Sequence, residues 1–150
     1  MGKVPNEMDY QGIGIRLVAQ IVDGIIFFFI FIIVGYFVAS IKGGLTPSGF
    51  ELHGIPALIS NSISFGIMFA YFIILEGVFG QTLGKKLCKI KVVKEDGTPC
   101  DLYASFIRNI LRIVDAIAVY LVGAILIARS DKKQRLGDRV AKTIVVKVKK

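Results

Sequence analysis

The chain contains few of the residues from which enzymes and metal centres are usually built. Its 150 residues include one histidine, His53, and two cysteines, Cys88 and Cys100, which form no CxxC pair and have no histidine nearby in the sequence. This scarcity argues against a zinc site and against a disulfide framework. The sequence also has no Ser/His/Asp arrangement and no nucleotide-binding motif. We therefore expect no enzyme activity, no catalytic residue, no cofactor and no bound metal.

Acidic residues are scarce as well, with 11 Asp and Glu against 19 Lys and Arg, so the net charge is +8. What remains is strongly apolar: 54% of the residues are hydrophobic and the mean hydropathy is +0.67. Such a composition excludes a soluble enzyme and a disordered chain. No Gly/Ser-rich or Pro-rich linker and no internal repeat is evident. We therefore expect residues 1–150 to form a single membrane domain.

Two long apolar stretches predict two membrane-spanning helices, at about residues 13–41 and 55–79. Each is long enough to cross a bilayer, which takes roughly 20 residues. The first stretch is too long for the apolar region of a signal peptide, and it contains charged residues, so we interpret it as a retained helix. The glycines and proline of residues 42–54 predict a connecting loop.

Most of the positive charge lies in residues 80–100, with five lysines, and in residues 129–150, with nine basic residues. The 42–54 loop contains only Lys42. Because Lys and Arg are enriched in cytoplasmic segments of membrane proteins, both basic segments are expected in the cytoplasm. This distribution favours contact with anionic lipid headgroups over nucleic-acid binding.

Both basic segments also carry a β-strand pattern. Lys89–Lys94 alternates charged and β-branched residues before a turn at Asp96 and Gly97, and Ala141–Lys150 has a similar character. Such alternation predicts strands. We therefore expect a short cytoplasmic β-pairing between the two segments, provided that both lie on the same side of the membrane.

Residues 101–128 leave two topologies open. Residues 101–115 have the pattern of an amphipathic helix, and residues 116–128 are wholly apolar but too short to span a bilayer alone. One alternative is a re-entrant helical hairpin that returns to the cytoplasm, and the other is a simple third crossing. The polar stripe of this helix consists of Asp101, Ser105, Arg108, Asn109, Arg112 and Asp115.

Charged residues inside the apolar segments are the main functional clue. Arg16 and Asp23 are seven residues apart, so they share a helix face at roughly 10 Å along the axis. Asp23 lies too deep to reach the membrane surface and needs a partner, because an ionised group in hydrocarbon costs roughly 2.5 kcal/mol or more. Arg16 alone could extend to the interface. Arg112 and Asp115 are spaced to pair on one helix, and an interfacial helix with its arginines on lipid phosphates is the alternative for this set.

These residues, taken in order, resemble the RDD family of small prokaryotic membrane proteins, which is named for one arginine and two aspartates. The similarity covers nearly the whole chain. Arg16 and Asp23 match the family's arginine and first aspartate, and both Asp115 and Asp138 fit the second aspartate. The further matching segments are Gly80-Gln-Thr-Leu-Gly-Lys-Lys with Ile90-Lys-Val-Val and Asp96-Gly97, Arg108-Asn-Ile-Leu-Arg-Ile-Val-Asp115, Gln134-Arg-Leu-Gly-Asp138 and Ala141-Lys-Thr-Ile-Val-Val.

The resemblance implies a multi-pass protein of the prokaryotic cell membrane with a role in transport, and cation/proton exchange is the activity proposed for the family. On this hypothesis a monovalent cation, a proton or a small ligand is handled by Arg16, Asp23, Arg108, Arg112 and Asp115. Because 150 residues are few for a carrier, a homo-oligomer would enclose the pathway. The alternative is a non-transporting assembly, scaffold or lipid-binding domain in which the Arg–Asp pairs are structural.

Four further residues are expected to support the site. Glu76 at the end of the second helix is placed to pair with a basic neighbour such as Lys85, although a solvated surface position is equally compatible with the sequence. Gly84 is expected to allow an unusual backbone angle at a tight helix exit. Asp138, in the matching turn of the second basic segment, is expected near Lys85, Lys86 or Arg139.

Overall fold

The structure is a computed structural model that describes residues 9–117 and 131–148, with the side chains of all of these except residues 114–117. The described part is mostly helical. It divides into two compact units: the first is formed by Met1–Val22 and Tyr71–Lys150, and the second by Asp23–Ala70.

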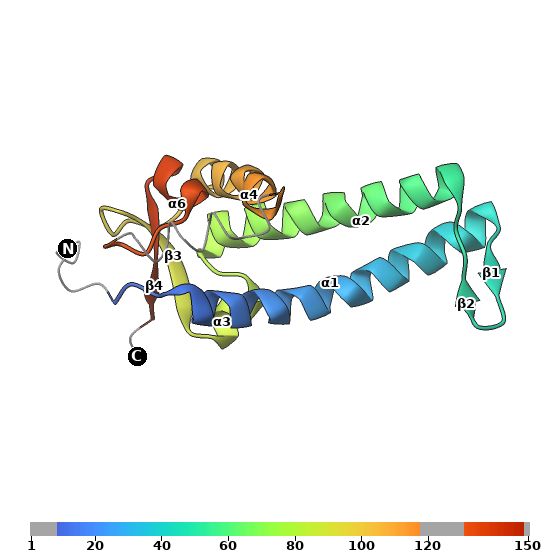
Figure 1. Cartoon of the computed structure of the whole chain (residues 1–150), viewed down its shortest axis with the longest axis horizontal. Helices are drawn as coiled ribbons and strands as arrows, with labels where there is room; N and C mark the ends of the chain where they lie inside the picture. Colours follow the sequence, from blue (N-terminus) through green and yellow to red (C-terminus); the bar gives the residue numbers. More distant parts are fainter. Residues whose placement is uncertain (1–8, 118–130, 149–150) are drawn as a thin grey trace. The chain divides into compact units, whose positions relative to one another are not determined.

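Two helices are long and apolar enough to cross a membrane. They are α1 (Ile13–Lys42) and α2 (Gly54–Ile74), which continues without a break as the π-helical segment η2 (Leu75–Phe79) (Figure 1). The sequence predicted both helices, but not the change to π-helical geometry at the end of the second. Large apolar side chains are exposed along both helices, as expected of surfaces that face lipid rather than water; examples are Phe28, Ile33, Phe37, Leu58 and Phe65.

The expected loop at 42–54 contains a small hairpin that was not predicted from the sequence. Its strands, β1 (Leu45–Thr46) and β2 (Gly49–Phe50), pair antiparallel (Figure 1). The Phe50 ring packs against Tyr36 of α1, with 5.0 Å between ring centroids. It also covers Gly35, where an added Cβ would lie 2.1 Å from a ring carbon of Phe50. Strands of two residues are too short to produce a recognisable alternating pattern.

The first unit contains the β-pairing that the basic segments predicted. β3 (Ile90–Lys94) and β4 (Thr143–Lys147) are antiparallel neighbours (Figure 1), with Val92 opposite Val145 at the centre. Each strand follows a short helix, α3 (Leu83–Leu87) before β3 and α6 (Leu136–Val140) before β4. The sequence predicted only turns at the positions of these two helices. Ile90, Val92 and Val145 of the strands form a buried cluster with three residues from outside the sheet, Ala19, Cys100 and Ala104.

The free edge of β4 is covered by the residues that lead into α1. Tyr10 forms a β-bridge with Val146. The Gln11 amide donates a hydrogen bond to the Val145 carbonyl at 2.9 Å, and the Lys147 amide donates to the Asp9 carbonyl at 3.0 Å. The start of α1 is therefore attached to the same sheet as both basic segments.

The remaining helix, α4 (Leu102–Ile117), is amphipathic as predicted, and its polar face is the buried one. Ser105 and Arg108 are 0% and 1% exposed, whereas Tyr103 and Ile113 on the opposite face are 75% and 55% exposed. An apolar face that points outward is typical of a helix in contact with lipid. The choice between a hairpin and a third crossing falls on residues 118–130, which lie outside the described ranges.

Candidate functional site

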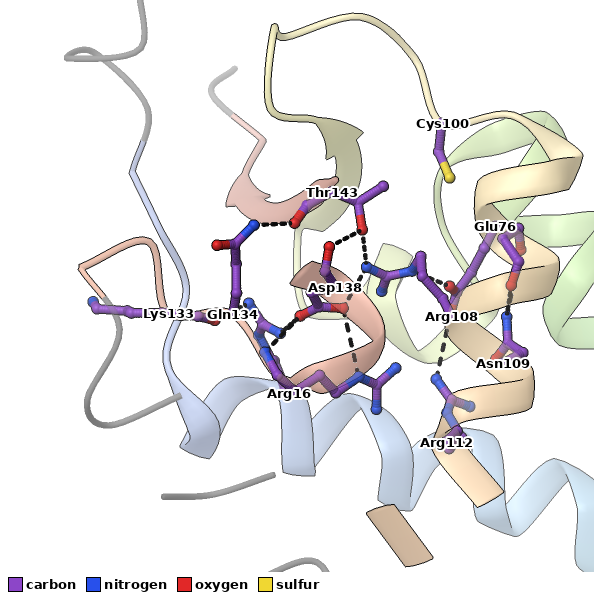
Figure 2. Close-up of polar contacts among 12 residues, drawn as sticks. Arg16, Glu76, Cys100, Arg108, Asn109, Arg112, Lys133, Gln134, Asp138 and Thr143 are labelled. Atoms are coloured by element: carbon purple, nitrogen blue, oxygen red, sulfur yellow. Dashed lines mark hydrogen bonds and ion pairs between the residues drawn. The ribbon is translucent and has the colours of Figure 1, made fainter. Parts of the chain in front are cut away.

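A buried arginine on α4 joins two buried carboxylates. Arg108 donates from Nη1 to Asp138 Oδ1 at 2.5 Å and from Nε to Glu76 Oε2 at 3.2 Å. Its Nη1 also donates to the Thr143 hydroxyl at 2.6 Å. Figure 2 shows the Arg108 side chain between the two acids. Because an unpaired buried charge is very costly, these three partners explain how Arg108 is accommodated at 1% exposure.

Asp138 lies in the first turn of α6 and accepts hydrogen bonds from the guanidinium groups of α1 and α4 and from a backbone amide at the start of α6. Arg16 of α1 donates from Nη1 to Asp138 Oδ2 at 2.6 Å, in addition to the bond from Arg108. The backbone amide of Arg135 donates to the same oxygen at 3.3 Å, as in a capped helix start. Burial alone would raise the pKa of Asp138, but Arg108, Arg135 and Arg16 hold this pKa well below its usual range.

Glu76 is the second buried acid, and it lies in the π-helical segment η2. Its carboxylate accepts bonds from Lys85 Nζ, from Arg108 and, at 3.4 Å, from Arg112 Nη2. The Arg112 guanidinium also lies over the Phe72 ring, 3.9 Å from its centroid. Glu76 is 0% exposed, so the surface position that the sequence left open is wrong. Single π-helical turns are frequent at functional sites.

Lys85 of α3 is the most perturbed lysine in the described part of the chain. It is 7% exposed and its ammonium contacts the Glu76 carboxylate. Burial lowers the pKa of Lys85 to about 7; Glu76 opposes this shift, whereas Arg108 and Arg112 add to it. Lys85 can therefore change its protonation state near neutral pH, as an ordinary surface lysine does not.

Together these contacts form one charge cluster, which ties α1, η2, α3, α4 and α6 to one another within the first unit. Its ion pairs run in sequence from Lys85 to Glu76, Arg108, Asp138 and Arg16 (Figure 2 shows the last four). Arg16 is fixed further by bonds to the carbonyls of Gln11 (3.0 Å) and Lys133 (2.7 Å). The members of the charge cluster are Arg16, Glu76, Lys85, Arg108, Arg112, Arg135 and Asp138.

The charge balance of this cluster limits what it can bind. Five cationic side chains surround two carboxylates, so a metal ion would meet an excess of positive charge. Among the described residues, no group of three or more His, Cys, Asp and Glu side chains is placed to hold a metal. A proton is different, because the cluster can take one up or release one on a side chain that it already contains.

The pairing of the predicted site residues differs from the expectation. Arg16, which was grouped with Asp23 because the two share a helix face, forms an ion pair with Asp138. Asp23 is buried at 1% exposure and belongs to the second unit. The side chain of Asp115 lies outside the part that the structure describes. Asp138 was expected near Lys85, Lys86 or Arg139; it contacts Arg16, Arg108 and Arg135 instead, because α6 presents it toward α4.

The expectation for Gly84 is also corrected. Gly84 lies within α3 and is buried, and the left-handed backbone angle belongs to Gly80, which ends η2 at φ 70°. A helix C-terminus is a common place for this conformation. Thr143 and Gln134 were not predicted from the sequence as site residues. Gln134 Nε2 donates to Glu95 Oε1 at 2.6 Å and to the Thr143 carbonyl at 2.8 Å, which holds the loop before α6 against β4.

Comparison with known proteins gives one family and two relatives. The model of the RDD family matches residues 10–142. The proline-rich antigen homologs of Mycobacterium tuberculosis strains CDC 1551/Oshkosh and H37Rv are each 32% identical over 74 residues. This match covers 49% of the present chain and 30% of each relative's length. No solved structure matches the chain.

Proposed function

Because this chain belongs to the RDD family of membrane proteins, we propose that it is a transport protein whose charge cluster handles a proton or a monovalent cation. The observation that carries the proposal is Arg108, which is fully buried and bridges the carboxylates of Glu76 and Asp138. Ionisable groups buried in membrane proteins commonly mark ion or proton pathways. The cationic excess of the cluster favours the proton over the metal cation. Asp23 and Asp115 remain proposed members of the pathway.

The proposed topology has both ends of the described chain in the cytoplasm of a prokaryotic cell. Its support is the sheet: β4 pairs with β3 on one edge and bridges to Tyr10 on the other, which favours a position of all three on the same side of the membrane. Their high content of lysine and arginine favours the cytoplasmic side. Of the two alternatives for residues 101–128, we propose the re-entrant hairpin, and the exposed apolar face of α4 supports it.

Cysteine labelling tests this topology. With Cys88 and Cys100 replaced by serine, Lys147→Cys should react with an impermeant thiol reagent only after the cells are opened. Ser48→Cys, in the hairpin between α1 and α2, serves as the matched control and should react in intact cells. Labelling of Lys147→Cys from outside would instead require a third crossing, which would contradict the sheet.

Proton flux into liposomes tests the transport function. The protein is reconstituted in phosphatidylethanolamine and phosphatidylglycerol with an internal pH-sensitive dye. Arg16→Lys and Asp23→Asn should lose most of the flux while the variants remain folded by circular dichroism. Asp131→Asn, at an exposed position, is the control and should keep the wild-type rate. Wild-type flux no faster than that of empty liposomes, with and without a sodium or potassium gradient, would overturn the proposal.

The alternative function is a membrane assembly or lipid-binding domain, and one observation favours it. The ion pairs of the charge cluster connect five helical elements, which is what a structural lock requires. On this hypothesis Arg16→Lys and Asp23→Asn lower the stability of the protein. Neither the wild type nor any variant then carries a proton flux. A homo-oligomer is proposed for the transport function, because several copies of the two long apolar helices could enclose a path.

A further inference from the structure

Two stretches of the chain, 53 positions apart, have similar sequences. Residues 80–93 read GQTLGKKLCKIKVV and residues 133–146 read KQRLGDRVAKTIVV, with six of the fourteen aligned positions identical. The identical residues are Gln, Leu, Gly, Lys and two Val. The expectation that the chain has no internal repeat is therefore wrong. The stretches were inconspicuous because the repeated part is short and is interrupted by α4.

The backbone repeats as well as the sequence. Each stretch begins with a left-handed residue, Gly80 at φ 70° and Lys133 at φ 50°. A five-residue helix follows, α3 in one case and α6 in the other. Each helix then leads through a second left-handed residue, Lys89 at φ 54° and Lys142 at φ 50°, into a five-residue strand. We call residues 80–95 and 133–148 the first and second helix–strand motifs.

The hydrogen bonds of the two motifs also correspond. Gln81 Nε2 donates to the carbonyl of Ile90 at 2.8 Å, and Gln134 Nε2 donates to the carbonyl of Thr143, the equivalent residue, at 2.8 Å. The strand ends are joined reciprocally. The Val148 amide donates to the Lys89 carbonyl at 2.8 Å, and the Glu95 amide donates to the Lys142 carbonyl at 3.0 Å.

The register of β3 and β4 relates the motifs by a local two-fold axis. Val92 and Val145 occupy equivalent positions and lie opposite each other at the centre of the pairing. Ile90 is equivalent to Thr143, and Lys94 is equivalent to Lys147. The pair of Ile90 with Lys147 at one end of the sheet therefore corresponds to the pair of Thr143 with Lys94 at the other end. An antiparallel pair with this property is symmetric about its central residues, in the way that a two-fold interface between subunits is.

The symmetry gives Lys85 and Asp138 the same structural position, the third residue of the short helix in each motif. Both side chains are buried, and both reach the charge cluster. Lys85 pairs with Glu76 and Asp138 pairs with Arg108, while Glu76 and Arg108 pair with each other. One motif therefore delivers a cation to one end of the buried Glu76–Arg108 pair, and the other motif delivers an anion to the other end.

We infer that the two helix–strand motifs are copies of one charge-presenting element, and that Lys85, the counterpart of Asp138, is the residue of the cluster that takes up and releases a proton. The equivalence of the motifs and the proton exchange at Lys85 stand without the proposed function. Only the role of this exchange in transport rests on it. Arg, Asp and Asp give the family its name, and Lys85 is a further residue of the same site.

The neighbours of Lys85 explain why it exchanges the proton rather than another group. Arginine side chains keep their proton at all physiological pH values. The Glu76 carboxylate faces three cations and stays ionised. The nearby Cys100 thiol stays neutral, because burial raises its pKa. Arg108 and Arg112 disfavour a further positive charge beside them, and they lower the pKa of Lys85 together with burial.

The test is the titration of Lys85, read by nuclear magnetic resonance of lysine side-chain nitrogens in detergent-solubilised full-length protein. One lysine signal should titrate near pH 7. It should disappear in Lys85→Met and persist in Lys86→Met, a matched control that replaces the adjacent exposed lysine. Arg112→Gln should move its midpoint upward by removing a neighbouring positive charge. If every lysine signal titrates above pH 9, the inference is overturned.

Flux measurements separate this inference from the proposed function. If both hold, the pH dependence of wild-type flux near neutral pH is lost in Lys85→Met and kept in Lys86→Met. A Lys85 titration near pH 7 without any flux would support a proton-exchanging Lys85 and overturn transport. Flux whose pH profile is the same in Lys85→Met and in the wild type would support transport and overturn the role of Lys85.

Discussion

Arg108 is the residue on which the first unit depends most directly, because it neutralises two carboxylates that have no access to solvent. Its Nε and Nη1 atoms donate to Glu76, Asp138 and Thr143. Such a buried network stabilises the fold only while every charge in it is paired. Removal of one partner leaves an unpaired buried charge, which strongly destabilises the protein. The same reasoning applies to each of its acids.

Asp138→Asn should destabilise the protein by about 3 kcal/mol, because Arg16 and Arg108 would then share a neutral amide in place of a carboxylate. The measurement is thermal or denaturant unfolding in a fixed detergent, followed by circular dichroism. Asp131→Asn, five residues before the start of α6 and exposed, is the control and should change the stability little. Equal stabilities of the two variants would show that the carboxylate of Asp138 is not part of a stabilising pair.

The stability that Asp138 contributes should depend on pH. Its pKa in the folded protein lies well below the unfolded value of about 3.9. The carboxylate therefore stabilises the fold fully above about pH 4, and this contribution is lost as pH falls below the unfolded pKa toward the folded one. The difference in melting temperature between wild type and Asp138→Asn should accordingly shrink as the pH is lowered from 5 toward 2. A difference that stays constant over this range contradicts the depressed pKa.

At the scale of the element, the close packing of α6 on α4 depends on a glycine. A Cβ added at Gly137 would lie 2.9 Å from the Arg108 carbonyl oxygen and 3.3 Å from the Arg108 Cα. Gly137→Ala should therefore cost about 2 kcal/mol, since backbone atoms cannot move aside as a flexible side chain can. Gly14→Ala in α1 is the control: an added Cβ there meets nothing within 4 Å, and alanine favours the helix. Unfolding measurements on the two variants should give changes of opposite sign.

The two helix–strand motifs predict matched effects at their left-handed lysines. Lys89 and Lys142 carry φ values of 54° and 50°, a conformation that costs a residue with a Cβ about 1 kcal/mol or more. Lys89→Gly and Lys142→Gly should each raise the stability, and by similar amounts, because the positions are equivalent. Lys86→Gly, inside α3, should lower it. Effects of opposite sign at Lys89 and Lys142 would contradict the structural equivalence of the motifs.

At the scale of the whole molecule, the sequence predicted the elements whose signals extend over many residues. The apolar runs of α1 and α2 and the alternating pattern of β3 and β4 are read directly from residue order, and the polar stripe of α4 follows from helical periodicity. The hairpin of β1 and β2 and the helices α3 and α6 escaped prediction, because two to five residues carry too little periodicity.

The ion pairs were harder to predict than the elements, for a physical reason. Sequence spacing identifies charges that share a helix face, which is why Arg16 was expected to act with Asp23. The ion pair of Arg16 with Asp138, which is 122 residues away, could not be read from such spacing, because the sheet and α6 bring Asp138 to Arg16. Ion pairs between residues far apart in the sequence depend on tertiary packing, here on the pairing of β3 with β4, so they cannot be predicted from spacing along one helix.

The location of Asp138 so far along the chain has a consequence for biosynthesis. Arg16 and Arg108 precede it by 122 and 30 residues, and both need its carboxylate. β4, which binds Tyr10 on one edge and β3 on the other, leaves the ribosome even later. Since chains fold from the N-terminus as they are made, α1 and α2 can insert while the charges near their ends still await their partner. A ribosome stalled before Asp138 should therefore hold an inserted but open protein, which a protease added on the side of the ribosome would cut.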